Sequence, residues 1–282
     1  MTLHVSFHTY PHFWPFPVSW KRWSKLSDKY QLGHALRVGM KRHGVRTSKA
    51  KKYEVPDSDI AVVWSWKQHR LIEGMLSSGR HVLVLERGFL PNRKEWCSLA
   101  LDGFNGRGRF APPADNGERW RTHFAHHLKP WKEGAGEYVL VIGKGANDVS
   151  LHGASFMAWL EEQVRLLLSA GHRVVYRPHP DRPTPCPEGA ELSTRTLKED
   201  LACASFIVSF NSSTDVEAVL SGVPAVITDP GSLAYPVAAH SVLEPLSRPD
   251  RTKWCHALAW RQWTAEELRN GDAWDHVKQL LA

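Results

Sequence analysis

The segment YVLVIGKGANDVS, residues 138–150, decides the fold class of this chain. Its first five residues form a short apolar, partly β-branched run, which predicts a strand buried on both faces of a parallel sheet. A glycine-rich loop follows the run. Apolar residues then recur at helical spacing from Phe156 to Leu168, until Gly171 ends the predicted helix. This order of strand, loop and helix is the first unit of a β/α repeat.

The same alternation continues to residue 228. Further strands are predicted at RVVYR (173–177), FIVSF (206–210) and AVIT (225–228), and further helices at TLKEDLACA (196–204) and TDVEAVLSG (214–222). Strand and helix alternate four times with short links. The sequence therefore predicts a parallel, doubly wound α/β sheet in this half of the chain.

The first half alternates less regularly. Strands are expected at residues 3–7, 60–64 and 81–85, and helices at 28–41 and 68–78, which favours a second, smaller Rossmann-like sheet. The chain after Pro236 is expected to be mostly helical and to pack back across a linker at 126–137. We thus expect two Rossmann-like domains, 1–132 and 133–240, followed by C-terminal helices at 241–282.

Composition narrows the class of protein. The 282 residues are 42% hydrophobic, with no apolar run of the roughly 18 residues that a membrane span needs. The N-terminus lacks the layout of a secretion signal. Four widely separated cysteines without a CxxC pair favour reduced thiols and a cytoplasmic protein: Cys97, Cys186, Cys203 and Cys255. The net charge of +7 and the 13 tryptophans make an anionic partner plausible and stacking on sugars or bases possible.

Three polar loops follow predicted strands of the second half, at residues 143–150, 177–182 and 209–214. In an open α/β sheet, ligands bind outside the carboxyl ends of the strands. Because these loops all begin at carboxyl ends, they are expected to converge on one ligand site.

The loop at 209–214 leads into a predicted helix. Asn211, Ser212 and Ser213 lie where that helix begins, so their side chains and the free backbone N–H groups would form an anion site. Glu217, one turn further, could accept hydrogen bonds from a ribose. The alternative is an ordinary helix cap, in which Ser213 or Thr214 pairs with Glu217 in a capping box.

The loop at 177–182 reads RPHPDR. Arg177 and His179 could both donate hydrogen bonds to phosphate oxygens. The flanking prolines reduce backbone freedom, so the imidazole would lose little entropy on binding. The alternative is a rigid surface turn with a solvated histidine.

Taken together, YRPHP, SFNSSTDVEAVLSGVPAVI and DPGSLAYPV resemble the C-terminal donor domain of GT-B glycosyltransferases, closest to the capsular-polysaccharide and Kdo-transferase-like group. The resemblance implies a nucleotide-sugar co-substrate, no tightly bound cofactor and no metal. It places Arg177 and His179 on the donor phosphate, where His179 also counts as catalytic. Ser212 and Ser213 would form the anion site, and Glu217 would contact the ribose.

The glycine-rich loop extends this resemblance. Gly143, Asp148 and Ser150 match the first donor-domain loop of the group, and Lys144 stands where glutamine is usual. These four residues, together with Asn211, complete the predicted donor-binding set.

The segment VLERGFLPNR (84–93) resembles the EDGF acceptor-side loop of Kdo transferases. Glu86, Gly88 and Phe89 match, but Arg87 replaces the aspartate that is a candidate catalytic base in those enzymes. Glu86 and Asp102 are the candidate replacements, since a base must be a carboxylate within reach of the acceptor hydroxyl. Arg87 could instead contact an anionic acceptor.

The stretch HTYPHFWPFPVSWKRWSK (8–25) interleaves aromatic rings with cations. Trp14, Lys21 and Arg22 are therefore candidate acceptor-binding residues, although a loop packing its rings on its own domain explains the pattern equally well. Residues 34–52, with close upstream neighbours, add nine lysines or arginines. Such a run is either a solvated face or a place to hold a polyanion.

A second cluster, HFAHH, puts three histidines on one predicted helix at spacings that could seat a metal, but no carboxylate or cysteine partner is evident nearby. These are His123, His126 and His127.

Three functions remain open. The chain could glycosylate a hydroxymethylated base in DNA, as small phage-type GT-B enzymes do, a function slightly favoured by its basic, aromatic-rich composition. It could instead extend a cell-surface polysaccharide or glycolipid, like Kdo transferases. The third is a non-catalytic nucleic-acid-binding protein on a decayed transferase fold, which the arginine at position 87 favours and the intact donor loops oppose.

Overall fold

The structure is a computed structural model that describes the chain except residues 1, 10–19, 51–53, 91 and 135, and except the side chains of residues 20–29. The described chain forms two compact units. Unit 1 comprises residues 1–119 and 256–282, and unit 2 comprises residues 120–255. Two helices straddle the division: α3 (Glu118–His123) and α7 (Thr252–Ala259).

Unit 2 is built around a five-stranded parallel sheet with the strand order β10-β9-β6-β7-β8. Its strands are β6 (Tyr138–Ile142), β7 (Val174–Arg177), β8 (Glu191–Leu192), β9 (Ala204–Ser209) and β10 (Ala225–Ile227). Its helices are η2 (Ala125–His127), η3 (Val149–Leu151), α4 (Phe156–Ser169), α5 (Leu197–Cys203), α6 (Thr214–Leu220) and η4 (Tyr235–Val237).

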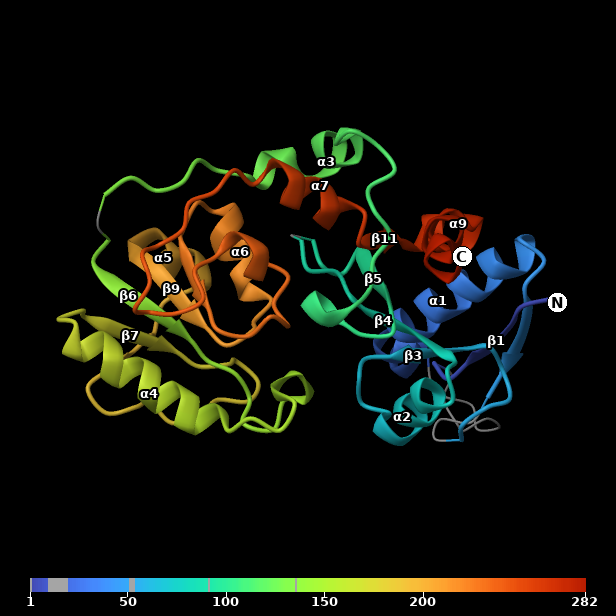
Figure 1. The fold of residues 1–282 in the computed structure, drawn as a ribbon, viewed down its shortest axis with the longest axis horizontal. Helices are drawn as coiled ribbons and strands as arrows, with labels where there is room; N and C mark the ends of the chain where they lie inside the picture. Colours follow the sequence, from blue (N-terminus) through green and yellow to red (C-terminus); the bar gives the residue numbers. More distant parts are fainter. Residues whose placement is uncertain (1, 10–19, 51–53, 91, 135) are drawn as a thin grey trace. The chain divides into compact units, whose positions relative to one another are not determined.

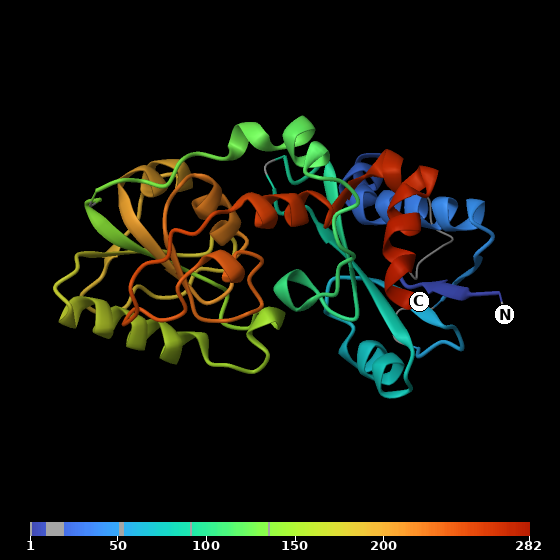
Figure 2. The same ribbon diagram turned by 45° about the horizontal axis from the view of Figure 1, so that its top comes forward.

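The strand order makes this a doubly wound sheet. The chain moves outward from β6 through β7 to β8, then returns to the other side of β6 with β9 and β10. The winding direction therefore reverses between β6 and β9. As a result, α4 covers one face of the sheet while α5 and α6 cover the other (Figures 1 and 2).

The centre of unit 2 is apolar on both faces of the sheet. Val141 lies between Tyr176 and Val208 in the register, and Leu160 and Val164 of α4 pack in the same core. Gly143 follows directly and donates its N–H to the Arg177 carbonyl at 2.7 Å. A Cβ at position 143 would lie 2.6 Å from that carbonyl oxygen, so the close approach of the β6 loop to β7 requires glycine.

Unit 1 contains a six-stranded sheet with the order β11-β5-β4-β3-β1-β2. Four strands are parallel, namely β1 (His4–Phe7), β2 (Arg46–Lys49), β3 (Ile60–Trp64) and β4 (His81–Arg87). β5 (Trp96–Leu101) is antiparallel to β4, and β11 (Gln262–Thr264) is antiparallel to β5. The helices are α1 (Trp20–Arg42), α2 (His69–Ser77), η1 (Asn105–Arg107), α8 (Ala265–Asn270), α9 (Asp272–Val277) and η5 (Lys278–Leu281).

The C-terminal helices complete the core of unit 1. Leu36 and Met40 of α1 pack with Leu268 of α8 and Trp274 of α9 over the sheet, while α2 lies on the opposite face (Figures 1 and 2). α1 approaches α8 so closely that a Cβ on Gly39 would lie 2.1 Å from the Leu268 carbonyl oxygen. Both ends of the chain therefore belong to unit 1.

Arg119 fastens the C-terminal segment to the rest of unit 1. Its guanidinium forms a two-pronged ion pair with Glu267 and donates to the carbonyls of Ala259 (2.8 Å) and Gln262 (3.0 Å). It also lies over three tryptophan rings, 4.8–5.5 Å from their centroids: Trp96, Trp260 and Trp263. Only 9% of the Arg119 side chain is exposed, so water screens these contacts little.

The predicted fold class, two Rossmann-like sheets with C-terminal helices, is confirmed. The sequence did not predict β2, β5, β8 and β11. The expectation of a mostly helical segment after Pro236 missed β11. β2 reads RTSK and carries no apolar alternation, because it is an edge strand. Within the described chain, no helix is long and apolar enough to cross a membrane.

Replacing Arg119 with alanine should destabilise unit 1. The substitution strands Glu267 in a largely buried position and frees two carbonyls, a loss that typically costs about 3–5 kcal/mol of unfolding free energy. The measurement is urea unfolding followed by tryptophan fluorescence, because three indoles surround the guanidinium.

A matched control is Arg165→Ala, which removes an exposed pair with Glu162 on α4. Exposed pairs of this kind contribute little to stability, because water screens them. Similar losses for the two variants would contradict the role given to Arg119.

Candidate functional site

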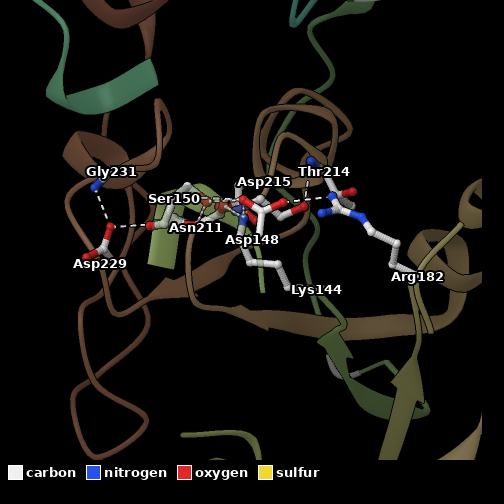
Figure 3. A network of polar contacts seen from close by, with 10 residues as sticks. Lys144, Asp148, Ser150, Arg182, Asn211, Thr214, Asp215, Asp229 and Gly231 are labelled. Atoms are coloured by element: carbon white, nitrogen blue, oxygen red, sulfur yellow. Dashed lines mark hydrogen bonds and ion pairs between the residues drawn. The ribbon is translucent and has the colours of Figure 1, made fainter. Parts of the chain in front are cut away.

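Three loops of unit 2 meet outside the carboxyl end of the sheet, at the point where the winding direction reverses. They follow β6, β7 and β9, and a fourth loop follows β10. Such a reversal leaves a crevice between the two flanking loops, and this is where doubly wound sheets bind ligands. Figure 3 shows the polar network that joins these loops.

The β6 loop holds a largely buried cation, Lys144. The Lys144 Nζ donates to the Asn211 carbonyl at 2.8 Å and lies 3.7 Å from Asp148 Oδ1. Asp148 Oδ1 also accepts from the Ser150 backbone N–H at 3.1 Å, and its Oδ2 accepts from Arg182 Nη2 at 2.7 Å. The carboxylate of Asp148 therefore links the β6 loop to the β7 loop (Figure 3).

Asn211 links the β6, β9 and β10 loops. Its Nδ2 donates to the Ser150 carbonyl at 2.9 Å and to Asp229 Oδ1 at 2.7 Å, and the Ser150 hydroxyl lies 3.0 Å from its Oδ1. Asp229 Oδ1 also accepts from the Gly231 N–H at 2.7 Å. Because Asn211 is only 5% exposed, each of these bonds forms away from bulk water.

The start of α6 is held by Asp215. Its Oδ2 accepts from the Ser212 N–H at 2.9 Å and from the Ser232 hydroxyl at 2.7 Å, and the Ser212 hydroxyl accepts from the Thr214 N–H at 3.2 Å. Asp215 therefore accepts the Ser212 N–H at the start of α6, while the Ser212 hydroxyl accepts the N–H of Thr214.

The contacts at the start of α6 differ from the capping box that the sequence offered as an alternative. Ser213 makes no side-chain cap hydrogen bond and is exposed, while Glu217 is half-buried on α6. The alternative considered for this helix start, a capping box of Ser213 with Glu217, is not formed, because Ser213 makes no side-chain cap hydrogen bond. The Ser213 hydroxyl is consequently not used to cap α6.

Burial shifts the pKa values of the network. Burial lowers the pKa of Lys144, against the opposing attraction of Asp148. Burial raises the pKa of the fully buried Asp215 to about 6. Burial also acts to raise the pKa of Asp148, but Lys144 and the hydrogen bonds from Ser150 and Arg182 outweigh it and lower that pKa to about 2. Lys144 and Asp148 therefore stabilise each other's charged forms inside the network.

His179 is held in one tautomer. Its Nδ1 accepts the backbone N–H of Asp181 at 3.1 Å, so the neutral ring carries its proton on Nε2. Burial, and next the positive charge of Arg182, lower the pKa of His179. The half-buried ring is therefore neutral near pH 7 and presents an N–H donor beside the network.

Arg177 is engaged away from the network. Its Nη1 donates to Asp200 Oδ2 at 2.8 Å and to the Arg195 carbonyl at 2.7 Å. Asp200 is fully buried and also accepts from the Ser193 hydroxyl at 2.6 Å. These bonds join the end of β7 to α5. The cation that the β7 loop brings to the network is Arg182, which is half-exposed.

In unit 1, Glu86 and Arg87 lie at the carboxyl end of β4, Glu86 half-buried and Arg87 exposed. The loop that follows is fixed by its backbone, because Gln262 Oε1 accepts from the N–H groups of Phe89 (3.1 Å) and Leu90 (3.3 Å). Residues 89 and 90 of the segment that resembles the acceptor-side loop are therefore held in place by Gln262.

Asp102 lies at the opposite end of β4 from Glu86. Its Oδ1 accepts from the Val82 N–H at 2.9 Å, and its Oδ2 lies 2.8 Å from His81 Nδ1 and 3.1 Å from Arg109 Nη1. Four residues of β4, about 13 Å, separate Glu86 from Val82, the residue that Asp102 bonds. The structure does not bring the two candidate bases together, and the contacts of Asp102 are those of a structural residue.

The remaining candidates lie elsewhere. Trp14 falls outside the described residues, and Lys21 and Arg22 lie on α1 at positions whose side chains are not described. The expected single helix for the histidine cluster was wrong, because α3 ends at His123 while His126 and His127 lie on η2. Among the described residues, no group of three or more His, Cys, Asp or Glu side chains could hold a metal ion.

Sequence reasoning missed Arg182, Asp215 and Asp229. Arg182 stands in the RPHPDRP stretch itself, and its position in a loop at a carboxyl edge was the available signal. Asp215 and Asp229 follow β9 and β10, where the same carboxyl-end rule applies. No local pattern tells which of these polar residues turn inward.

Comparison with known proteins finds similar structures but no similar sequence family. A scan against protein-family models and a search of curated proteins both find no match. Among solved structures, the chain is similar to the beta Kdo 2,4 transferase KpsC of Thermosulfurimonas dismutans, with 15% identity and a TM-score of 0.57 over 82% of this chain and 88% of that one. It is also similar to the beta Kdo 2,7 transferase KpsC of the same organism, with 14% identity and a TM-score of 0.55 over 100% of both chains.

Neither similarity supports the predicted DNA acceptor, and identities this low carry the fold alone. This chain has two sheets of mainly parallel strands, and it is similar to these structures over most of its length. The chain has the GT-B fold of glycosyltransferases, among which Kdo transferases are structural neighbours.

Proposed function

We propose that this protein is a glycosyltransferase that moves a sugar from a nucleotide-sugar donor, bound by unit 2, to a hydroxyl of a cell-surface glycan or glycolipid. The observation that carries the proposal is the convergence of three polar loops at the β6–β9 reversal of a GT-B fold. The two KpsC structures to which the chain is similar are named as Kdo transferases, which favours a glycan acceptor over a base in DNA.

In this proposal the donor phosphate binds where the β6, β7 and β9 loops meet. His179 donates from Nε2, Arg182 contributes its half-exposed guanidinium, and the hydroxyls of Ser212 and Ser213 complete the contacts. Lys144, which bonds the Asn211 carbonyl, adds a positive charge beside these contacts. These donors would stabilise the charge that develops on the departing phosphate, which is a large term in transfer reactions of this kind. Gly143, Asp148, Ser150 and Asn211 shape the loops around it.

Two further roles follow from position. Arg177 would act by positioning, because its bonds to Asp200 fix the strand from which the His179 loop starts. Glu217, on α6 one turn beyond the phosphate contacts, would accept hydrogen bonds from the ribose. No metal is required by this scheme, since side-chain cations and N–H donors balance the phosphate charge.

Unit 1 would bind the acceptor. We assign the general base to Glu86, the carboxylate at the carboxyl end of β4, and leave Asp102 out because it lies at the other end of that strand. Arg87, exposed beside it, would contact negative charge on the acceptor. Trp14, Lys21 and Arg22 remain proposed acceptor contacts.

The proposal is tested first with a panel of UDP-, GDP- and CMP-sugars. We expect at least one of them to raise the thermal unfolding temperature and to serve as donor to a lipid-linked or surface glycan, detected by mass analysis. Hydroxymethylated DNA should receive no sugar. A protein that no nucleotide-sugar stabilises would contradict the transferase, and transfer to DNA would contradict the acceptor.

His179→Ala should lower the turnover number by about 100-fold or more, because the leaving phosphate loses an oriented N–H donor. The control is His172→Ala, which removes an exposed histidine that precedes β7 at the opposite edge of the sheet. Circular dichroism would show that both variants fold. Unchanged turnover in His179→Ala would exclude the phosphate contact.

Donor affinity should depend on pH through Asp215. As the pH falls through about 6, Asp215 takes up a proton and a negative charge near Lys144 disappears, so an anionic donor should bind more tightly. Asp215→Asn mimics the protonated form. It should bind donor more tightly than the natural protein at about pH 7.5 and show a weaker pH dependence.

The ligand in this measurement is a nucleotide-sugar, whose diester phosphates keep their charge across the range. Protonation of His179 acts in the same direction, so a smaller slope should remain in Asp215→Asn. Identical pH profiles for the two proteins would remove Asp215 from the donor site.

A further inference from the structure

The loop between β3 and α2, residues 65–68, begins beside the carboxylate that we assign as the general base. β3 is the neighbour of β4 in the unit 1 sheet and runs parallel to it, so this loop leaves the sheet at the same edge as Glu86. The register pairs Trp64 with Leu85, which puts Ser65 level with Glu86.

This edge also contains the winding reversal of unit 1. The chain moves from β1 outward to β2, then returns to the other side of β1 with β3 and continues to β4. Doubly wound sheets bind ligands outside the carboxyl ends of the strands at such a reversal. The loop after β3 is one of the two loops that flank it.

The backbone of Ser65 adopts a conformation that its residue type disfavours. Its φ is +62°, in the left-handed region, and the residue is only 7% exposed. The other non-glycine residues with positive φ in the described chain are asparagine, aspartate or histidine, which adopt this region more readily. The Ser65 N–H donates to the Leu85 carbonyl at 2.9 Å, which fixes the residue against β4. Backbone strain that is retained in this way is common in ligand-binding loops.

The ring of Trp66, the next residue, stacks on the ring of Phe104. The two centroids are 5.5 Å apart, and the angle between the planes is 21°. Phe104 is buried, whereas Trp66 is half-buried. Part of the Trp66 side chain therefore stays accessible, although the stack fixes the ring in place.

The stacked pair lies on the face of the sheet that carries Glu86. Phe104 belongs to the loop after β5, in which a Cβ on Gly108 would lie 2.7 Å from the Ala100 Cβ. Ala100 points to the same face as Ser98, two residues away, and Ser98 is directly opposite Glu86 in the register. The stacked pair joins this loop to the loop after β3, so it spans β4 on the Glu86 face.

Gln68 ends the loop with a buried polar side chain. It precedes α2 at the N-cap position but makes no side-chain cap hydrogen bond. The residue is 4% exposed, and its Oε1 has no hydrogen-bond partner among the described residues. A buried acceptor without a donor lowers stability. Packing alone would therefore favour an apolar residue at this position.

The loop residues match the chemistry of a sugar ring. A sugar has an apolar face of C–H groups, which packs on an aromatic ring, and its hydroxyls can donate to an amide oxygen. Ser65, Trp66 and Gln68 are uncharged, and an aromatic surface with a few fixed polar groups is the usual composition of a site for a small organic ligand.

We propose that Trp66 and Gln68 form a subsite for the acceptor sugar that carries the attacking hydroxyl. The inference rests on the proposed function, which places the acceptor on unit 1 and assigns the base to Glu86. In this subsite the sugar ring packs on Trp66 and one of its hydroxyls donates to the Gln68 amide. The attacking hydroxyl then faces Glu86.

The test uses the full chain without donor, and methyl glycosides of hexoses and N-acetylhexosamines as probes. Binding is followed by saturation-transfer NMR, which detects ligands of millimolar affinity. We expect at least one glycoside to bind, and to bind about tenfold more weakly to Trp66→Ala, which removes the aromatic surface. Trp66→Phe keeps an aromatic ring and should bind better than Trp66→Ala.

Gln68→Leu separates binding from packing. It should weaken glycoside binding, while its thermal unfolding temperature stays the same or rises, because an unpaired buried polar atom is removed. This variant decides the outcome if Trp66→Ala does not fold.

The matched control is Trp159→Ala. It removes a half-buried tryptophan of unit 2 that stacks on Phe156 in a similar geometry, with centroids 5.4 Å apart and planes at 30°. Trp159→Ala should bind glycosides like the natural protein, and circular dichroism would show that the variants fold. Absence of binding to every glycoside, equal losses in Trp66→Ala and Trp159→Ala, or normal binding by Gln68→Leu would overturn the proposal.

Adenine is the remaining probe, because tryptophan rings also stack on nucleobases. If adenine bound through Trp66 more tightly than every glycoside, the loop would be a nucleobase site and the proposal would fail. Glycoside binding is measured without donor or transfer. A protein that nucleotide-sugars stabilise but no glycoside binds would therefore lose this subsite and keep the proposed transferase activity.

Discussion

The side-chain amide of Asn211 connects the loops that form the site of unit 2, and the site depends on these hydrogen bonds. Parallel strands deliver their loops to one edge, but nothing in a sheet fixes those loops to each other. Asn211 does so, because its nitrogen bonds the Ser150 carbonyl and Asp229 while its oxygen lies within reach of the Ser150 hydroxyl. A carboxylate there would meet Asp229 without a donor, and an apolar side chain would leave the other groups buried and unpaired.

The charged side chains around Asn211 are already paired with one another in the absence of a ligand. Lys144 and Arg182 both contact Asp148, and Asp215 holds Ser212 and Ser232. A bound phosphate would have to compete with these carboxylates for the same cations. This competition makes the site selective. A ligand with negative charge alone would not displace the carboxylates, so a ligand that binds must make further contacts.

Most of unit 2 could be predicted because its strands are buried on both faces and appear as continuous apolar runs. β2 could not, since an edge strand reading RTSK has no core face to mark it. β11 pairs with β5 across more than half of the chain, and no local pattern encodes such a partner. The bond from Arg177 to Asp200, 23 residues away, was equally impossible to predict from a local pattern. The positions of the polar loops could be predicted, because ligands bind at the carboxyl ends of parallel strands.

The return of the chain to unit 1 has a consequence for biosynthesis. The strand β11, the helix α8 that meets Gly39, and Glu267 that meets Arg119 all come from the last 21 residues. Unit 2 is an insertion between two parts of unit 1, so its whole sequence has left the ribosome before unit 1 is complete. Domains fold as units during synthesis. The sheet of unit 2, although it is translated second, is therefore the first that can finish folding. The sheet of unit 1 keeps β5 unpaired on one side until β11 has been translated.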